Sequence, residues 1–180
     1  MFSKNLVFTG KHARFLRELA PAKGAGEQQG QTVFQNNMDV VKAAPLIGFC
    51  RKHPSPVDHD KDVTDNNIFT EQVLKIQADL TFAYRLIMLL DAPEKFSVQE
   101  RLDKAFRYDN QEEKRKPGDD VFWAYVRGGI EVLHEELVEN SSSLSDDVMA
   151  VADFLDQFRA VDCLGFSAER LEALCRKAGV

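Results

Sequence analysis

The chain has 180 residues and a formal net charge of −6, and 44% of its residues are hydrophobic and 29% charged. These are globular values for a length that fits one domain, and they argue against wholesale disorder and against a need for disulfide or metal staples. The longest apolar run, residues 86–90, is far shorter than the ~20 residues of a membrane-spanning helix, and the N-terminus lacks a secretory signal, so we expect no membrane segment.

The N-terminal third of the chain is basic. Residues 1–53 carry eight basic and three acidic side chains, a net charge of +5 that leaves −11 for the remainder. Such a split can mark a surface that binds DNA or an acidic partner, although folding can also mix the two halves and cancel the field. The candidate residues for this surface are Lys4, Lys11, Arg14, Arg17, Arg51 and Lys52.

The first predicted helices lie in this basic third. Residues 11–20 place apolar side chains on one side, and Pro21 ends that helix. The Gly- and Gln-rich segment that follows is expected to form a loop over residues 21–32. Residues 33–50 are apolar on all sides, which is typical of a buried helix, and Pro45 is expected to kink or split it.

The middle of the chain alternates polar loops and helices. A loop rich in Asp is expected over residues 51–67, and apolar residues then recur every three or four positions from Ile68 to Leu90, which predicts the central helix of a bundle. Ser97 and Glu100 have the spacing of a capping box, which predicts a helix that runs to about Arg107. We expect a charged loop over residues 108–118 and a helix over 121–139.

Two more helices are expected in the C-terminal part, one around residues 148–158 and one that begins after Ser167. No segment alternates polar and apolar residues strongly enough to predict a strand. The sequence therefore predicts one all-α domain over residues 1–180, a bundle of six or seven helices joined by long polar loops.

Candidate metal sites fail on the spacing of their ligands. The loop that starts at Asp58 begins like a calcium loop, but no register supplies both the required glycine and the final Glu. A single Glu-x-x-His element, Glu131 to His134, is present, whereas di-iron bundles need two. We expect no metal and no cofactor. The cysteines are odd in number and scattered, which predicts no disulfide framework and a reducing, cytoplasmic setting: Cys50, Cys163 and Cys175.

Arg127 and His134 lie seven residues apart on a predicted helix, so their side chains face roughly the same way. This spacing resembles the RNase motif of HEPN-domain proteins, in which an Arg and a His assist attack of a ribose 2′-hydroxyl on the adjacent phosphate. Histidine suits general acid–base work and arginine stabilises phosphate charge. Three flanking carboxylates would repel RNA, so a metal-independent RNase is kept as an alternative only: Glu131, Glu135 and Glu136.

Gly128 and Gly129 lie inside the same predicted helix. Each glycine costs about 1 kcal/mol relative to alanine there, so something must offset that cost. The close approach of another helix backbone is the usual reason, and a conformational hinge is the alternative. We predict close helix packing at this pair.

Two segments resemble a known family. Residues 34–49 are similar to the early helix of small accessory proteins encoded beside bacterial DNA phosphorothioation genes, and Arg51 and Lys52 follow as basic residues do in that family. Residues 122–133 look like its later Tyr-Ala-x-Gly-Gly-Leu-Glu-Ile-Leu stretch, while Pro45 departs from its pattern. The resemblance implies a component of a bacterial DNA-modification or phage-defence system, and no active-site residue carries over from it.

The sequence thus favours a non-catalytic helical accessory or adaptor protein of such a system. Its expected partners are other proteins of the same system, with DNA as a further partner of the basic N-terminal third. A homo-oligomeric scaffold without a nucleic-acid role is the remaining alternative beside the RNase.

Overall fold

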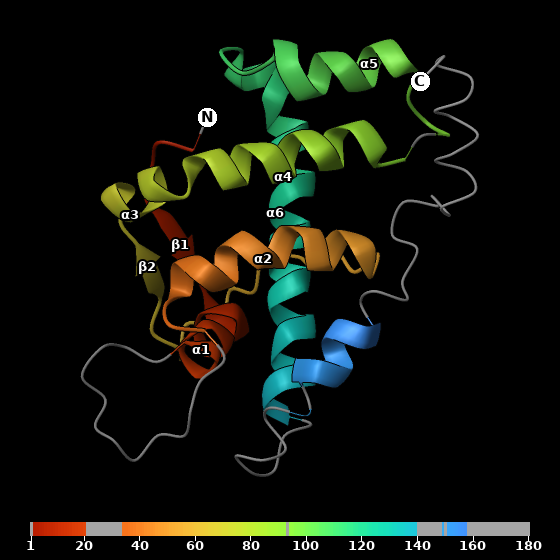
Figure 1. Ribbon diagram of the computed structural model, residues 1–180. Helices are drawn as coiled ribbons and strands as arrows, with labels where there is room; N and C mark the ends of the chain where they lie inside the picture. Colours follow the sequence, from red (N-terminus) through yellow and green to blue (C-terminus); the bar gives the residue numbers. More distant parts are fainter. Residues whose placement is uncertain (1, 21–33, 93, 140–148, 150, 158–180) are drawn as a thin grey trace.

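The computed structural model describes residues 2–20, 34–92, 94–139, 149 and 151–157. It confirms the all-α class, and the only strands in these ranges form one short antiparallel pair (Figure 1). Residues 151–157 are also helical. The remaining elements are β1 (Leu6–Phe8), α1 (Gly10–Leu19), α2 (Asn37–Cys50), β2 (Asn66–Ile68), α3 (Thr70–Lys75), α4 (Gln77–Leu90), α5 (Val98–Leu102), the π-helical turn η1 (Asp103–Arg107), α6 (Glu112–His134) and the π-helical turn η2 (Glu135–Glu139).

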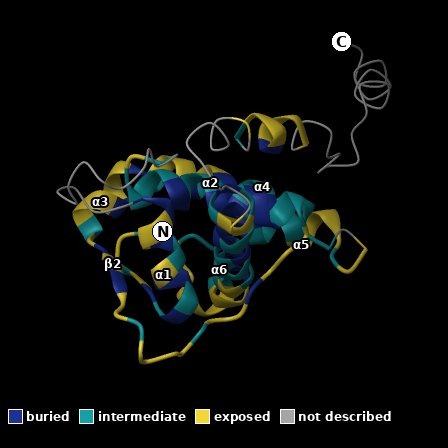
Figure 2. Cartoon of the chain, turned by 90° about the horizontal axis from the view of Figure 1, so that it is seen from below, coloured by how far each residue is buried: buried dark blue, intermediate teal, exposed yellow. Residues whose placement is uncertain are grey.

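Helix α6 is the axis of the fold. Figure 1 shows α2 and α4 crossing it one beside the other, with α5 near one end of α6 and α1 near the other. The buried residues of these helices face one another, and the exposed residues lie on the outside of the molecule (Figure 2). Fully buried side chains from the three crossing helices form the centre of the core: Val40, Val41, Leu80, Ile87, Phe122, Val126 and Ile130.

The sequence predicted that Pro45 kinks or splits this helix; α2 is continuous through Pro45, so the proline does not split it. The helix begins at Asn37, where the Asn36 side chain accepts a hydrogen bond from the Asp39 amide at 3.1 Å. Pro45 is itself buried, and Ala44 and Gly48 on either side of it contact α6. This packing compensates for the backbone hydrogen bond that the proline removes.

Residues 112–118 are helical, which corrects the loop predicted over 108–118. Charged residues and Pro117 gave this segment the composition of a loop, but side-chain hydrogen bonds of Arg115 and the packing of Gly118 hold it in the helix. Arg115 donates to the backbone oxygen of Asp109 at 2.6 Å and to the Asp119 carboxylate at 3.0 Å. Gly118 is buried against Tyr84 of α4.

The strand pair was missed because three-residue strands are too short to show an alternating pattern. Leu6 pairs with Ile68 and Phe8 with Asn66, so the end of the loop predicted over 51–67 is the strand β2. This pairing ties the N-terminal segment to the chain that leads into α3. Loop segment 21–32 and the helix expected after Ser167 lie outside the described residues.

Cys50, at the end of α2, is disulfide-bonded, which corrects the expectation of no disulfide framework. Among the described helices, none combines the length and the apolar character needed to cross a bilayer.

The predicted capping box is present at the start of α5. The Ser97 hydroxyl accepts from the Glu100 amide at 3.2 Å, and the Glu100 carboxylate accepts from the Ser97 amide at 2.8 Å. We expect Ser97→Ala to destabilise α5 by about 1 kcal/mol, because the Glu100 amide loses its side-chain acceptor. Hydrogen exchange of the Glu100 amide measures this directly, with Ser3→Ala, at another exposed serine, as the control. Unchanged protection of Glu100 would contradict the expectation.

Candidate functional site

Residues 53–55, which follow α2, are hydrogen-bonded to α6. The Ser55 amide donates to the carbonyl of Ala124 at 2.9 Å, and Arg127 Nε donates to the carbonyl of Ser55 at 2.9 Å. A Cβ built on Gly128 would overlap the carbonyl oxygen of His53. Gly128 therefore lets this segment lie directly on the helix, and the hydrogen bonds of Arg127 and Ser55 hold it in that position.

A cluster of polar side chains, here called the Glu131 cluster, forms where this segment meets α1 and α6. Its members are Lys11, His12, His53, Ser55 and Glu131. Glu131 Oε1 lies 2.9 Å from Lys11 Nζ and 2.8 Å from His12 Nε2, and Oε2 lies 2.8 Å from His53 Nε2. The Ser55 hydroxyl also donates to Glu131. One carboxylate thus joins α1, the segment at 53–55 and α6.

The surroundings of Glu131 stabilise its charged form. Burial on its own would raise the pKa of Glu131, but the hydrogen bonds from Ser55, Lys11, His53 and His12 outweigh it and lower the pKa to about 2. His12 is 1% exposed, and burial lowers the pKa of His12 despite the neighbouring Glu131. The carboxylate is therefore ionised and His12 neutral at neutral pH.

Ser55, His12 and Glu131 do not form a nucleophilic triad. Such a triad needs the serine and the carboxylate on opposite nitrogens of the imidazole ring, so that the ring can pass a proton between them. Here Glu131 Oε1 lies 2.8 Å and Ser55 Oγ 3.4 Å from the same nitrogen, Nε2 of His12. Ser55 also donates its proton to Glu131. The cluster is arranged to hold the fold together.

Close helix packing surrounds Gly129. A Cβ built on Gly129 would overlap the carbonyl oxygen of Ala44, and one built on Gly48 would overlap the carbonyl oxygen of Tyr125. We call this contact the α2–α6 crossing. It joins the segments at residues 34–49 and 122–133.

The candidate basic residues are mostly engaged within the chain. Lys52 is exposed, and among the described residues no contact engages its amine. The other five contact acidic side chains or a backbone oxygen: Lys4 with Glu112, Lys11 with Glu131, Arg14 with Glu18, Arg17 with the Thr64 carbonyl, and Arg51 with Glu136. The fold therefore neutralises much of the N-terminal positive charge.

Arg127 and His134 have different neighbours. Arg127 contacts Ser55, whereas His134 is buried and stacks on Phe15 with ring centroids 3.9 Å apart. Nε2 of His134 contacts Glu18, and Nδ1 lies 3.2 Å from Glu139. The structure thus does not bring the arginine and the histidine of the RNase alternative to one site, and carboxylates face both ring nitrogens.

The Asp-rich loop contributes a cap to α1. Asp58 Oδ2 accepts from the Lys11 amide at 2.7 Å, and the Thr9 hydroxyl donates to the Asp58 carbonyl. The hydrogen bonds from the backbone amides of Lys11 and, to a smaller extent, Asp60 lower the pKa of Asp58. Within the described ranges, no group of three His, Cys, Asp or Glu residues is placed to hold a metal ion.

An apolar groove, here called the α4 groove, is open on the surface. It is lined by α4 and by Phe106 of η1, and its volume is 570 Å³. Its large apolar side chains stand out of the surface, with Phe82 64% and Phe106 47% exposed. Arg85 is the one charged residue of its lining, which consists of Gln77, Ala78, Thr81, Phe82, Arg85, Leu86, Leu89 and Phe106.

The fold and these contacts define an all-α protein with a glycine-mediated helix crossing and an exposed apolar groove. Comparisons with protein families, with curated proteins and with solved structures find no significant match to this chain.

Proposed function

We propose that this chain is a non-catalytic accessory protein of a bacterial DNA-modification or phage-defence system, and that it binds a partner protein through the α4 groove. The observation that carries the proposal is the exposed aromatic side chain of Phe82, in an apolar surface that the described part of the chain leaves uncovered. Exposed apolar patches of this kind mark protein contacts. The resemblance at the α2–α6 crossing supplies the class of system.

The shape of the α4 groove favours an amphipathic helix as its occupant. Ala78, Phe82 and Leu89 recur at helical spacing and span about 16 Å along α4, roughly three helical turns. A helix that packs its apolar ridge against α4 and Phe106 would fill this length. Arg85 is the one charged lining residue and already pairs with Asp109 at 3.0 Å, so the groove favours an apolar ridge on its occupant and does not require a carboxylate there.

DNA contact is a weaker part of the proposal, because five of the six candidate basic side chains already have partners within the chain. If phosphate contacts nevertheless drive DNA binding, affinity will fall steeply with salt. A cytoplasmic location belongs to the same proposal and requires that the disulfide at Cys50 opens under reducing conditions.

The test compares two exposed phenylalanines. Phe82 lies in the α4 groove and is 64% exposed, and Phe69 lies outside it at the start of α3 and is 62% exposed. A partner is first identified by co-purification from the native host and then purified, and its affinity is measured by calorimetry for wild type, Phe82→Ser and Phe69→Ser. We expect Phe82→Ser to weaken binding by about tenfold or more, and Phe69→Ser to leave it unchanged.

Equal affinity of both variants would contradict the proposed surface, and a partner unrelated to DNA modification or defence would contradict the proposed system. Light scattering, which measures the molar mass in solution, tests the homo-oligomer alternative. A dimer that Phe82→Ser dissociates would assign the α4 groove to a second copy of the chain and overturn the proposal.

A further inference from the structure

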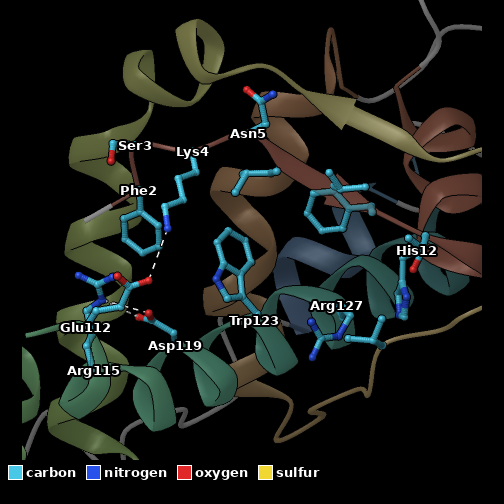
Figure 3. A pocket seen from close by; sticks show the side chains of 15 residues that line it. Phe2, Ser3, Lys4, Asn5, His12, Glu112, Arg115, Asp119, Trp123 and Arg127 are labelled. Atoms are coloured by element: carbon cyan, nitrogen blue, oxygen red, sulfur yellow. Dashed lines mark hydrogen bonds and ion pairs between the residues drawn. The ribbon is translucent and has the colours of Figure 1, made fainter.

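A cavity lies between the N-terminal segment and one face of α6 (Figure 3), and we call it the N-terminal cavity. Its volume is 520 Å³, within the range of small-molecule sites in proteins. Residues 2–9 form one wall. The opposite wall consists of side chains that recur every three or four residues along α6: Glu112, Arg115, Asp119, Trp123 and Arg127.

The charges of this cavity are divided between its two ends. Lys4 pairs with Glu112 at 3.4 Å and Arg115 with Asp119 at 3.0 Å, so charges at this end are balanced. Figure 3 shows these residues together on one side of Trp123, and Arg127 and His12 on the other side. Both carboxylates of the lining belong to the balanced end.

Arg127 is the cation at the other end. Its Nε donates to the carbonyl of Ser55, and among the described residues no carboxylate lies within ion-pair distance of its guanidinium. Its two terminal nitrogens therefore remain available to a ligand. They lie in the plane of the guanidinium group and can donate paired hydrogen bonds to carboxylate or phosphate oxygens. His12 beside it is neutral at neutral pH, because burial lowers the pKa of His12.

Trp123 supplies an aromatic surface between the two ends. Its ring meets the rings of Phe2, Phe8 and Phe122 at steep angles, with centroids 5.9, 6.5 and 5.2 Å away. These edge-to-face contacts fix the orientation of the indole ring. The three phenylalanines thus preorganise the wall against which a flat ring can stack.

We infer that the N-terminal cavity binds a small molecule made of a planar ring and one anionic group, with the ring on Trp123 and the anion at Arg127. A nucleoside monophosphate and an aromatic carboxylate both have this chemistry. Neither the α4 groove nor a partner protein is needed for this binding, so the inference is independent of the proposed function.

Trp123 is the single tryptophan of the chain, so its fluorescence reports on this cavity alone. Wild-type protein is titrated with adenosine monophosphate, adenosine, inorganic phosphate and benzoate, and calorimetry repeats each titration. We expect a saturable change with adenosine monophosphate or benzoate, and affinities for adenosine and phosphate at least about tenfold weaker than for adenosine monophosphate. The two anionic ring compounds distinguish a phosphate ligand from a carboxylate ligand.

The variants separate the role of Arg127 from an effect on folding. Arg127→Met removes the guanidinium group and should weaken binding at least about tenfold. Arg127→Lys keeps the positive charge and is less disruptive, so it should weaken binding less. Arg14→Met, at an exposed arginine of α1 outside the cavity, should have no effect. Absence of saturable binding of every probe by wild type at millimolar concentration would overturn the inference. So would equal affinity of wild type for adenosine and for adenosine monophosphate, or equal affinity of wild type and folded Arg127→Met for the anionic ring compound that binds.

Discussion

Gly129→Ala is expected to lower the free energy of unfolding by about 3 kcal/mol, although alanine is the better helix former. The added methyl group would overlap the carbonyl oxygen of Ala44, which belongs to the backbone of α2 and cannot rotate away. The two helices would have to separate, and buried side chains on both, such as Val41 and Val126, would lose contacts. Urea unfolding followed by circular dichroism at 222 nm measures the change.

The control for Gly129→Ala uses an exposed position of the same helix. Lys116 is exposed on α6, and the difference between Lys116→Ala and Lys116→Gly gives the preference of this helix for alanine, expected to be about 1 kcal/mol. The substitution at Gly129 should have the opposite sign. If Gly129→Ala stabilised the protein by the amount found at Lys116, the α2–α6 crossing would not be as close as the structure shows.

The same crossing shows which parts of the fold a sequence can predict. Residues 68–90 predicted one helix because their apolar side chains recur at helical spacing. The structure has α3 and α4 over residues 70–90, with a short break at Ile76, whereas Ile68 belongs to β2. Hydrophobic periodicity is local, so it can be seen without the partner helix. Residues 112–118 could not be predicted in this way, because Gly118 packs on Tyr84 of α4, a residue distant in the sequence, and no local spacing shows that contact.

The Glu131 cluster could not have been assembled from the sequence. Its five side chains come from α1, from the segment at residues 53–55 and from α6, and no local spacing relates these segments. One signal was available: Glu131 lies between the apolar residues Ile130 and Val132, where a carboxylate is unusual unless it has partners. That signal indicates a buried polar contact but does not identify Lys11, His12 or His53.

Glu131→Gln is expected to lower the free energy of unfolding at pH 7 by about 3 kcal/mol. A carboxyl group whose pKa is 4.5 when unfolded and about 2 when folded contributes roughly this amount. Glutamine keeps the shape but loses the negative charge that faces Lys11 and both histidines. The matched control is Glu112→Gln on the same helix, whose exposed pair with Lys4 should change stability by less than about 1 kcal/mol.

The pH dependence of this difference identifies the charge as its cause. Because the folded pKa of Glu131 is lowered, its contribution is complete above pH 4.5 and is lost as the pH falls from there toward 2. The lowered pKa of His12 makes wild type lose stability earlier, below pH 6.5, since the unfolded chain then binds the extra proton. The gap between wild type and Glu131→Gln should therefore be wide at pH 5 and narrow by pH 3, as urea unfolding at each pH measures. Two outcomes would contradict this role of the ionised carboxylate in holding α1, residues 53–55 and α6 together. One is a difference in unfolding free energy that is the same at pH 5 and pH 3. The other is a difference no larger than that caused by Glu112→Gln.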